Sequence, residues 1–129
     1  MSKVAKTYSE ISLETSVSPK DTNPIELIIM VFEKTFDHLT RGKKELEIGK
    51  NGVEYFSKAV DLLNMGLIAS LNKEKGGQIA ENLELIYLCA IQNIIQGRLQ
   101  KKPEKIDDAI KVLRPIYLGW SDLKSKGVN

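Results

Sequence analysis

The clearest pattern in the chain is a series of apolar residues at three- and four-residue intervals that begins just after position 24. This spacing is that of one face of an α-helix. Asn23 is a favourable N-cap, Pro24 suits the first helical position, and Glu26 falls at the third. The pattern predicts a helix from Asn23 to about Ile48, ended by the glycines and asparagine of residues 49–52. Its apolar face consists of Ile25, Ile28, Ile29, Phe32, Phe36 and Leu39.

Two further helices are predicted over about residues 53–72 and 78–100, and a tight turn at 73–77 with two adjacent glycines joins them. Each carries two apolar stripes, so each is expected to contact more than one neighbour. The stripes of the first are Val53, Phe56, Val60, Leu63 and Leu67, and Ala59, Leu62, Met65 (or Gly66) and Ala69. Those of the second are Ile79, Leu83, Ile86, Ala90 and Ile94, and Leu88, Ile91, Ile95 and Leu99. The helix over 78–100 leaves few solvent-facing positions in its middle, which predicts a central place in the fold.

A fourth helix is predicted from about Glu104, with Ile106, Ile110, Leu113, Tyr117 and Trp120 on its apolar face. Pro115 lies inside it and is expected to kink it, because proline cannot donate a backbone hydrogen bond. Residues 1–22 are polar and predict a flexible N-terminal arm, and residues 125–129 predict a disordered tail. No alternating strand pattern occurs. The predicted fold is therefore all-α, an antiparallel up-down four-helix bundle over residues 23–124.

Length and charge limit the classes of function. The chain has 129 residues, enough for one domain, and a net charge of only +2. Its densest basic groups, at residues 41–44 and 101–102, lie beside helix breaks and form no basic stripe, so no nucleic-acid partner is expected. The longest apolar runs, residues 27–32 and 86–91, are far short of the roughly 20 residues of a membrane span. With no signal-peptide core at the start, the sequence predicts a cytoplasmic protein without membrane insertion.

The residue types needed for catalysis or metal binding are sparse. His38 is the only histidine, and no second histidine or thiol stands at ligand spacing from it, so no metal site is expected. Cys89 is a single cysteine within an apolar run, which favours a buried structural thiol over a nucleophile. Gly76 and Gly77 follow no strand and precede no Gly-Lys-Ser/Thr, so they form no phosphate loop. These features predict a binding protein that is not an enzyme and needs no cofactor.

Several short motifs, in order, resemble the FliS-like family of flagellin-specific flagellar export chaperones. Residues 23–33 resemble the family's Ser-Pro-x-x-Leu-Ile-x-Met-Leu-Tyr-Asp helix start, with Asn23 in place of the serine and Phe32 in place of the tyrosine. Residues 58–63 resemble the second-helix pattern, and residues 71–83 followed by Tyr87 give the strongest match. Residues 107–113 followed by Trp120 match the last helix, in which Pro115 is a departure from the pattern. The resemblance extends from Tyr8, where the family has a tyrosine in its mobile arm, to Trp120.

This resemblance implies a chaperone that binds the disordered C-terminal segment of flagellin, prevents its premature polymerisation and keeps it competent for flagellar type III export. It also implies that the flagellar export gate or a regulator of flagellar gene expression is a further partner. The alternative is a divergent helical adaptor or co-chaperone that forms a homodimer or binds another flagellar protein without binding flagellin. In that alternative the surplus apolar stripes form the dimer interface.

The surplus stripes of the two middle helices also indicate where a client binds. A bundle buries one broad face of each helix, and a second apolar face suits a groove that accepts an amphipathic segment. We expect the client to lie across several helices and to contact Leu62, Met65, Ala69, Leu88, Ile91 and Ile95. The competing interpretation is that these six residues are ordinary core. We further expect the arm, through Tyr8 and Ile11, to cover the empty groove, and Trp120 to be a packing anchor.

Overall fold

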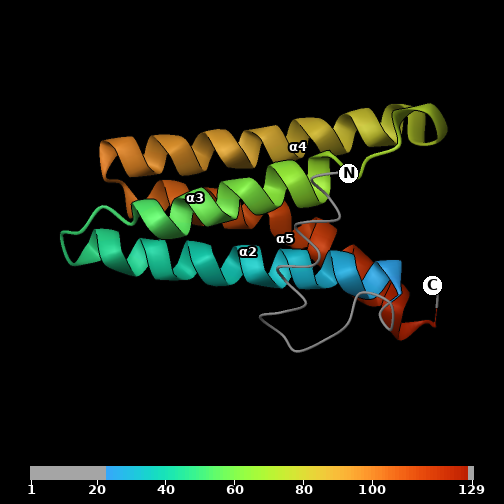
Figure 1. The fold of residues 1–129 in the computed structure, drawn as a ribbon, viewed down its shortest axis with the longest axis horizontal. Coiled ribbons are helices and arrows are strands. Elements are labelled where there is room, and N and C mark those ends of the chain that lie inside the picture. Colours follow the sequence, from blue (N-terminus) through green and yellow to red (C-terminus); the bar gives the residue numbers. More distant parts are fainter. Residues whose placement is uncertain (1–22, 128–129) are drawn as a thin grey trace.

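Residues 23–127, the part of the chain described by the computed structural model, form four helices that run alternately up and down (Figure 1). The helices are α2 (Pro24–Glu47), α3 (Val53–Asp61) with its continuation η2 (Leu62–Ile68), α4 (Lys73–Gln100) and α5 (Pro103–Ser125). No strand occurs within this range. The predicted all-α antiparallel bundle is confirmed. The predicted arm (residues 1–22) and residues 128–129 lie outside the described residues.

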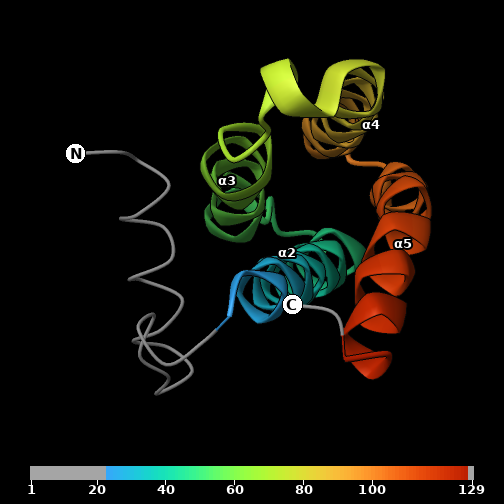
Figure 2. The same cartoon turned by 90° about the vertical axis from the view of Figure 1, so that its right-hand side faces the viewer.

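Viewed along its axis, the bundle places α4 diagonally across from α2, with α3 and α5 between them (Figure 2). α2 packs against α3 and α5, and α4 packs against the same two helices. α4 is therefore a corner of the bundle, with neighbours on two sides, and the prediction that it is the central helix is wrong. Its many apolar positions include a face that no other described helix covers.

The start of α2 has the predicted N-cap and N-terminal proline. The Asn23 side chain accepts a hydrogen bond of 2.9 Å from the backbone N–H of Glu26, and Pro24 occupies the first turn. This cap satisfies one of the backbone donors that a helix leaves unpaired at its start. α2 continues without interruption to Glu47, which confirms that it extends past Gly42.

The second predicted helix is present but changes its winding. Regular α-helix ends at Asp61, and residues 62–68 form a π-helix, a wider helix that is uncommon in proteins. The backbone N–H of Ala69 accordingly donates to the carbonyl of Asn64, five residues earlier, at 3.0 Å. The π-helix buries four of its seven residues, namely Leu62, Leu63, Gly66 and Leu67. The helix ends four residues before the predicted end at Asn72.

The predicted tight turn at 73–77 is instead a helical turn that opens α4. Asn72 caps this turn by accepting a 3.0 Å hydrogen bond from the backbone N–H of Lys75. The chain then bends at Gly77, whose φ of 51° and ψ of −127° are non-helical and favour glycine. Figure 2 shows the first turn lying across the direction of the rest of α4, at one end of the bundle. The long segment after Gly77 begins and ends where the sequence predicts.

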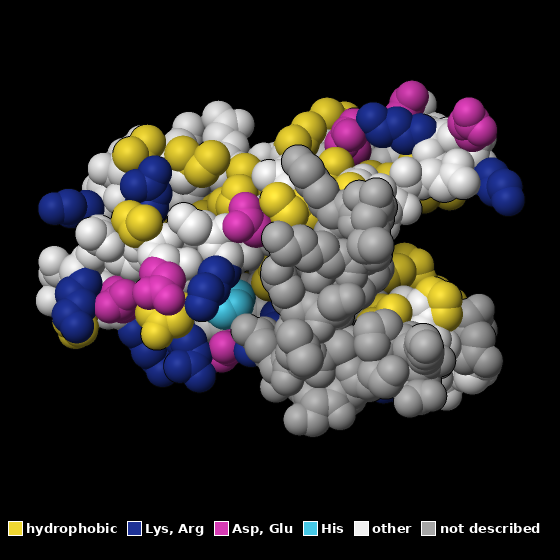
Figure 3. All heavy atoms as spheres, viewed as in Figure 1, with side chains coloured by type: hydrophobic (Ala, Val, Ile, Leu, Met, Phe, Trp, Pro, Cys, Tyr) yellow, Lys and Arg dark blue, Asp and Glu magenta, His cyan; other side chains and the backbone are white. Residues whose placement is uncertain are grey.

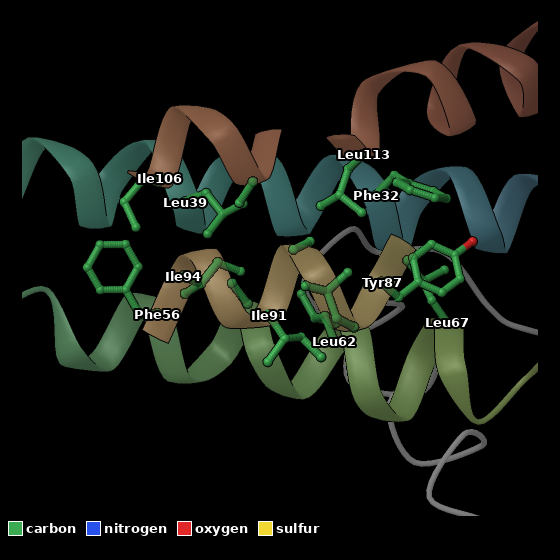
Figure 4. Packing of buried hydrophobic residues seen from close by; sticks show 14 of the residues in the cluster. Phe32, Leu39, Phe56, Leu62, Leu67, Tyr87, Ile91, Ile94, Ile106 and Leu113 are labelled. Carbon is green, nitrogen blue, oxygen red and sulfur yellow. The ribbon is translucent and has the colours of Figure 1, made fainter. Parts of the chain in front are cut away.

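The core runs the length of the bundle and takes side chains from every helix (Figure 4). Phe32 and Leu39 of α2 face Ile94 and Tyr87 of α4 across the centre, and Leu113 closes the α5 side. Two exposed contacts also join α5 to α2: the Tyr117 hydroxyl donates to Glu33 at 2.8 Å, and Lys43 pairs with Asp107 at 3.0 Å. Because exposed pairs contribute little, apolar burial stabilises this fold.

The approach of α2 to α3 depends on the missing side chain of Gly42. A Cβ atom placed there would lie 2.5 Å from Cε1 of Phe56, whose ring is only 1% exposed and cannot move aside. We expect Gly42→Val to lower the free energy of unfolding by about 1–3 kcal/mol, the usual cost of overpacking a core. Urea unfolding followed by circular dichroism measures this difference.

The control is Gly119→Val in α5, where a Cβ atom meets nothing within 4 Å. This change should leave the free energy of unfolding within about 0.5 kcal/mol of the original, because valine is only slightly better than glycine in a helix. Equal effects of the two substitutions would contradict the close packing of Gly42 against Phe56.

Candidate functional site

The structure divides the six bundle residues predicted to contact a client into two groups. Leu62 and Ile91 are each only 9% exposed and belong to the core cluster. Leu88 and Ile95 are 46% and 39% exposed, Ala69 is exposed and Met65 is half-buried. Tyr8 and Ile11 lie outside the described residues. Four of the six predicted bundle contacts are therefore accessible to a partner.

Helix α4 carries more than half of the large apolar side chains that are exposed in the described part of the chain. Nine large apolar side chains are exposed among the described residues, and five of them belong to this helix. Four of these five share one helical face, which we call the α4 stripe: Leu85, Leu88, Ile95 and Leu99. Figure 3 shows apolar side chains gathered at the surface over α3 and α4. Leu85 was missed from the sequence, although it precedes Leu88 by three positions and so continues the same face.

A shallow pocket of about 190 Å³ lies between α3 and α4, beside the α4 stripe. Ile95 belongs to both the pocket and the stripe, and Asp61 and Arg98 add one acidic and one basic group. The complete lining is Phe56, Ser57, Val60, Asp61, Ile94, Ile95 and Arg98. This pocket widens the stripe into a surface that two helices share.

A larger pocket of about 350 Å³ lies at the end of the bundle where α4 begins, and we call it the apolar pocket. The end of the π-helix, the first turn of α4 and Ile28 of α2 form its walls, and Trp120 of α5 contributes an indole ring. The lining residues are Ile28, Gly66, Leu67, Ser70, Leu71, Asn72, Lys75, Gly76, Ile79, Ala80, Leu83, Tyr87 and Trp120. A concave site with this lining accepts an apolar or aromatic side chain.

Sequence reasoning missed the apolar pocket because its walls depend on the two backbone irregularities. Trp120 is half-buried and packs against the core cluster, in keeping with its predicted role as a packing anchor, but it also lines the pocket. Ile79, predicted on one of the two apolar stripes of its helix, is 72% exposed at the pocket's rim. The helical spacing of Ile79 indicates that it makes an apolar contact. The bend at Gly77 determines which part of the molecule it contacts.

The charged groups form a separate hollow on α2 and α3 that contains Asp37, Arg41, Lys44, Glu45 and Tyr55. Arg41 donates from Nε to the two carboxylate oxygens of Asp37 at 3.2 and 3.1 Å. This hydrogen bond raises the pKa of Arg41, with a smaller contribution from Tyr55. Asp37 and Arg41 in this hollow already pair with each other at the surface. We therefore interpret their interaction as an ordinary exposed ion pair.

Residues that could bind a metal ion do not gather in the part of the chain that the structure describes. No group of three or more histidine, cysteine, aspartate or glutamate side chains there has a suitable arrangement. Cys89 is exposed, which corrects the expectation of a buried thiol, because its position on α4 faces away from the core. Over residues 23–127, no helix combines the length and the apolar character needed to span a membrane.

The chain matches known proteins over nearly its whole length. The family model for the flagellar protein FliS matches residues 4–127. The chain is 32% identical over 123 residues to the flagellar secretion chaperone FliS of Salmonella typhimurium, covering 94% of this chain and 90% of that protein. It is 28% identical over 118 residues to the protein of the same name from Vibrio cholerae, covering 90% and 85% of the two chains. It is also 27% identical to the flagellar secretion chaperone FliSB of Pseudomonas aeruginosa, covering 94% and 95%. With nearly its whole length matched by the family model, the chain belongs to the FliS family of flagellar proteins.

Proposed function

We propose that this chain is a cytoplasmic flagellar export chaperone that binds the C-terminal segment of flagellin without catalysis and without a cofactor. Bound in this way, flagellin is held back from polymerisation and stays competent for flagellar type III export. The relatives in three bacteria are named flagellar secretion chaperones, which supports the export role. The observation that carries the proposal is the apolar pocket, a concave site at the end of the bundle that is lined mostly by apolar side chains.

The energy of binding a disordered client sets the size of the contact. Ordering such a segment costs about 2–5 kcal/mol, and association itself costs about 4–15 kcal/mol. At about 25 cal/mol per Å² of apolar surface, offsetting both takes about 240–800 Å². One aromatic side chain in the apolar pocket buries only about 150–250 Å². Over nearly all of this range one side chain is not enough, so we expect the client to extend beyond the pocket and cross several helices.

The accessible residues give this client a path. An apolar side chain of the client fills the pocket beside Trp120, and the segment continues past Ala69 and Met65 to Leu88 and Ile95. Methionine suits such a surface because its unbranched chain adapts to different partners. Leu62 and Ile91 lie in the core below this path, and each offers only the 9% of its surface that remains exposed.

The arm is the proposed cover of the empty pocket. Residues 1–22 join α2 at Asn23, and Ile28, little more than one helical turn further on, lines the apolar pocket. We propose that Tyr8 and Ile11 of the arm occupy the apolar surface in the absence of client and leave it when flagellin binds.

A second candidate function is that of a divergent adaptor or co-chaperone that self-associates or binds another flagellar protein without binding flagellin. The exposed α4 stripe favours some protein partner but has no chemistry that selects flagellin. Binding of a flagellin C-terminal segment decides between the two functions.

Ile79 and Ile48 provide a matched pair of variants for the client site. They are the same residue type, are 72% and 70% exposed, and lie at opposite ends of the bundle. We expect Ile79→Glu, at the rim of the apolar pocket, to weaken binding of a flagellin C-terminal peptide by about tenfold or more, because a carboxylate there must be desolvated. Isothermal titration calorimetry measures the dissociation constants.

The matched substitution Ile48→Glu should leave the dissociation constant within about twofold, since its site is far from the pocket. The original chain should bind the peptide one-to-one with a negative heat-capacity change, the mark of apolar burial. A well-folded chain that binds no flagellin peptide would exclude the proposed function and favour the adaptor.

Deleting residues 1–22 tests the arm. If the arm covers the apolar surface, its removal exposes that surface and should raise the association rate constant of the flagellin peptide by severalfold. Stopped-flow fluorescence of Trp120 reports binding, because this indole lines the pocket and is the only tryptophan of the chain. The double replacement Tyr8→Ala and Ile11→Ala should act in the same direction, whereas unchanged rates in both variants would contradict a covering role.

A further inference from the structure

We propose that the apolar pocket receives the very end of the client chain, with an apolar side chain of its last residues inside the pocket and its terminal carboxylate held at the rim by Lys75 and Asn72. This inference rests on the proposed function, since it names the part of the flagellin segment that the pocket holds. It also fixes the direction of the client, whose chain runs from the pocket towards the α4 stripe.

Lys75 gives the apolar pocket its charge. Among the described residues that line the pocket, it is the only charged one, and most of the others are apolar. Lys75 is exposed, and no ion pair joins it to another residue within 23–127. Its neighbour Lys73, in contrast, pairs with Glu84 at 2.9 Å and does not line the pocket, and neither does Glu74 between the two lysines. The rim therefore carries one cation that is available to a negative group of a ligand.

Asn72 places a second donor beside this cation. Its side-chain Oδ1 accepts a hydrogen bond of 3.0 Å from the backbone N–H of Lys75, which holds the amide in one orientation. The other atom of the amide, Nδ2, carries two N–H groups, and Asn72 also lines the apolar pocket. Lys75 and Asn72 thus offer an ammonium and an amide donor from the same turn. Hydrogen bonds from such donors to a carboxylate are stronger than those between neutral groups.

An apolar cavity with a cation at its rim fits a ligand that is apolar on one side and anionic on the other. The end of a protein chain has this character, because its terminal carboxylate has a pKa of about 3.3–3.7, is ionised at neutral pH and lies beside the last side chains. Capture of a terminal carboxylate is also one of the recurring ways in which proteins recognise peptides. An aspartate or glutamate inside the client would offer a carboxylate too, but the chain would then have to leave the pocket in two directions.

The place of the pocket in the fold favours a chain end over the middle of a chain. The pocket lies at one end of the bundle, where the first turn of α4 lies across the direction of the rest of the helix (Figure 2). Ile79 at its rim is 72% exposed and begins the long part of α4, which carries the α4 stripe. A client that ends in the pocket keeps its remaining residues on the helices, whereas a client that passes through leaves part of its length beyond the bundle.

Three forms of one flagellin C-terminal peptide test this inference with the full chain. They are the free acid, the same peptide with an amidated C-terminus, and a free acid extended by a short glycine tail that moves the carboxylate away from the last side chains. We expect the free acid to bind about five- to tenfold more tightly than the other two, because only its carboxylate reaches Lys75 while the pocket is filled. Isothermal titration calorimetry measures the three dissociation constants.

Variants of the rim identify the residues responsible. Lys75→Gln should bind the free acid and the amide about equally, and Lys75→Arg should keep the preference because it keeps the charge. Asn72→Asp retains a good N-cap but replaces the amide donor with a carboxylate, so it should reduce the preference as well. Lys73→Gln is the control, because this lysine pairs with Glu84 and lies outside the pocket lining, so the preference should stay within about twofold. Circular dichroism confirms that all variants are folded.

Three results would overturn the inference: equal binding of the free acid and the amide, a preference that Lys75→Gln leaves unchanged, or a glycine-extended peptide that binds as tightly as the free acid. The last result would mean that charge attracts the peptide without a defined place for its end. Failure of the proposed function is distinguishable from these results. If no form of the peptide binds, the proposed function and this inference both fail, whereas equal binding of all three forms overturns this inference alone.

Discussion

Helix α4 carries more apolar surface than its place in the bundle can cover, and much of the structure follows from this imbalance. The buried residues of its inner face are Ala80, Tyr87, Ala90, Ile91, Ile94 and Gly97. Three of these six are alanine or glycine, and at those positions a neighbouring helix can approach α4 closely. Leu85, Leu88 and Leu99 lie on another side, which the other described helices leave exposed. The bundle is complete without them, so their exposure calls for a partner.

The apolar pocket arises from a second constraint, the geometry of the connection between α3 and α4. The π-helix of residues 62–68 brings Gly66 and Leu67 to the pocket wall, and the bend at Gly77 turns the first turn of α4 across the bundle end. Two regular helices joined by a tight turn would lack this transverse segment. π-Helices are uncommon and occur frequently at functional sites. The pocket is thus a product of irregular backbone, and its lining is apolar because the same residues also extend the core.

The bundle could be predicted from the sequence because its signals are local. Asn23, Pro24 and Glu26 mark one helix start within four residues, and apolar spacing defines each helix that follows. The site was harder to predict because periodicity shows that a residue lies on an apolar face but not what stands opposite. Leu88 and Ile91 lie on one predicted stripe, yet Leu88 is 46% exposed and Ile91 only 9%.

The backbone irregularities gave no signal of this kind. The apolar residues of the π-helix have the spacing expected of an α-helix, so the sequence of residues 62–68 predicts a regular α-helix. The helical pattern predicts Asn72 as the last residue of one helix, but an asparagine is also a good N-cap, and in the structure Asn72 caps the next helix. Ile79 lies at its predicted position in the helical pattern but is largely exposed, because the bend at Gly77 lies only two residues before it.

The size of the exposed apolar surface suits reversible binding. Covering a fully exposed leucine or isoleucine contributes about 1.5–3 kcal/mol, so the four residues of the α4 stripe, all already partly covered, contribute at most about 6–12 kcal/mol. This is close to the cost of association, about 4–15 kcal/mol, so the stripe alone binds weakly. Tight binding needs the stripe and the apolar pocket together, and a partner that loses either contact dissociates readily. Two weak contacts suit a chaperone that must release its client for export better than one strong contact does. The two contacts can be broken one after the other.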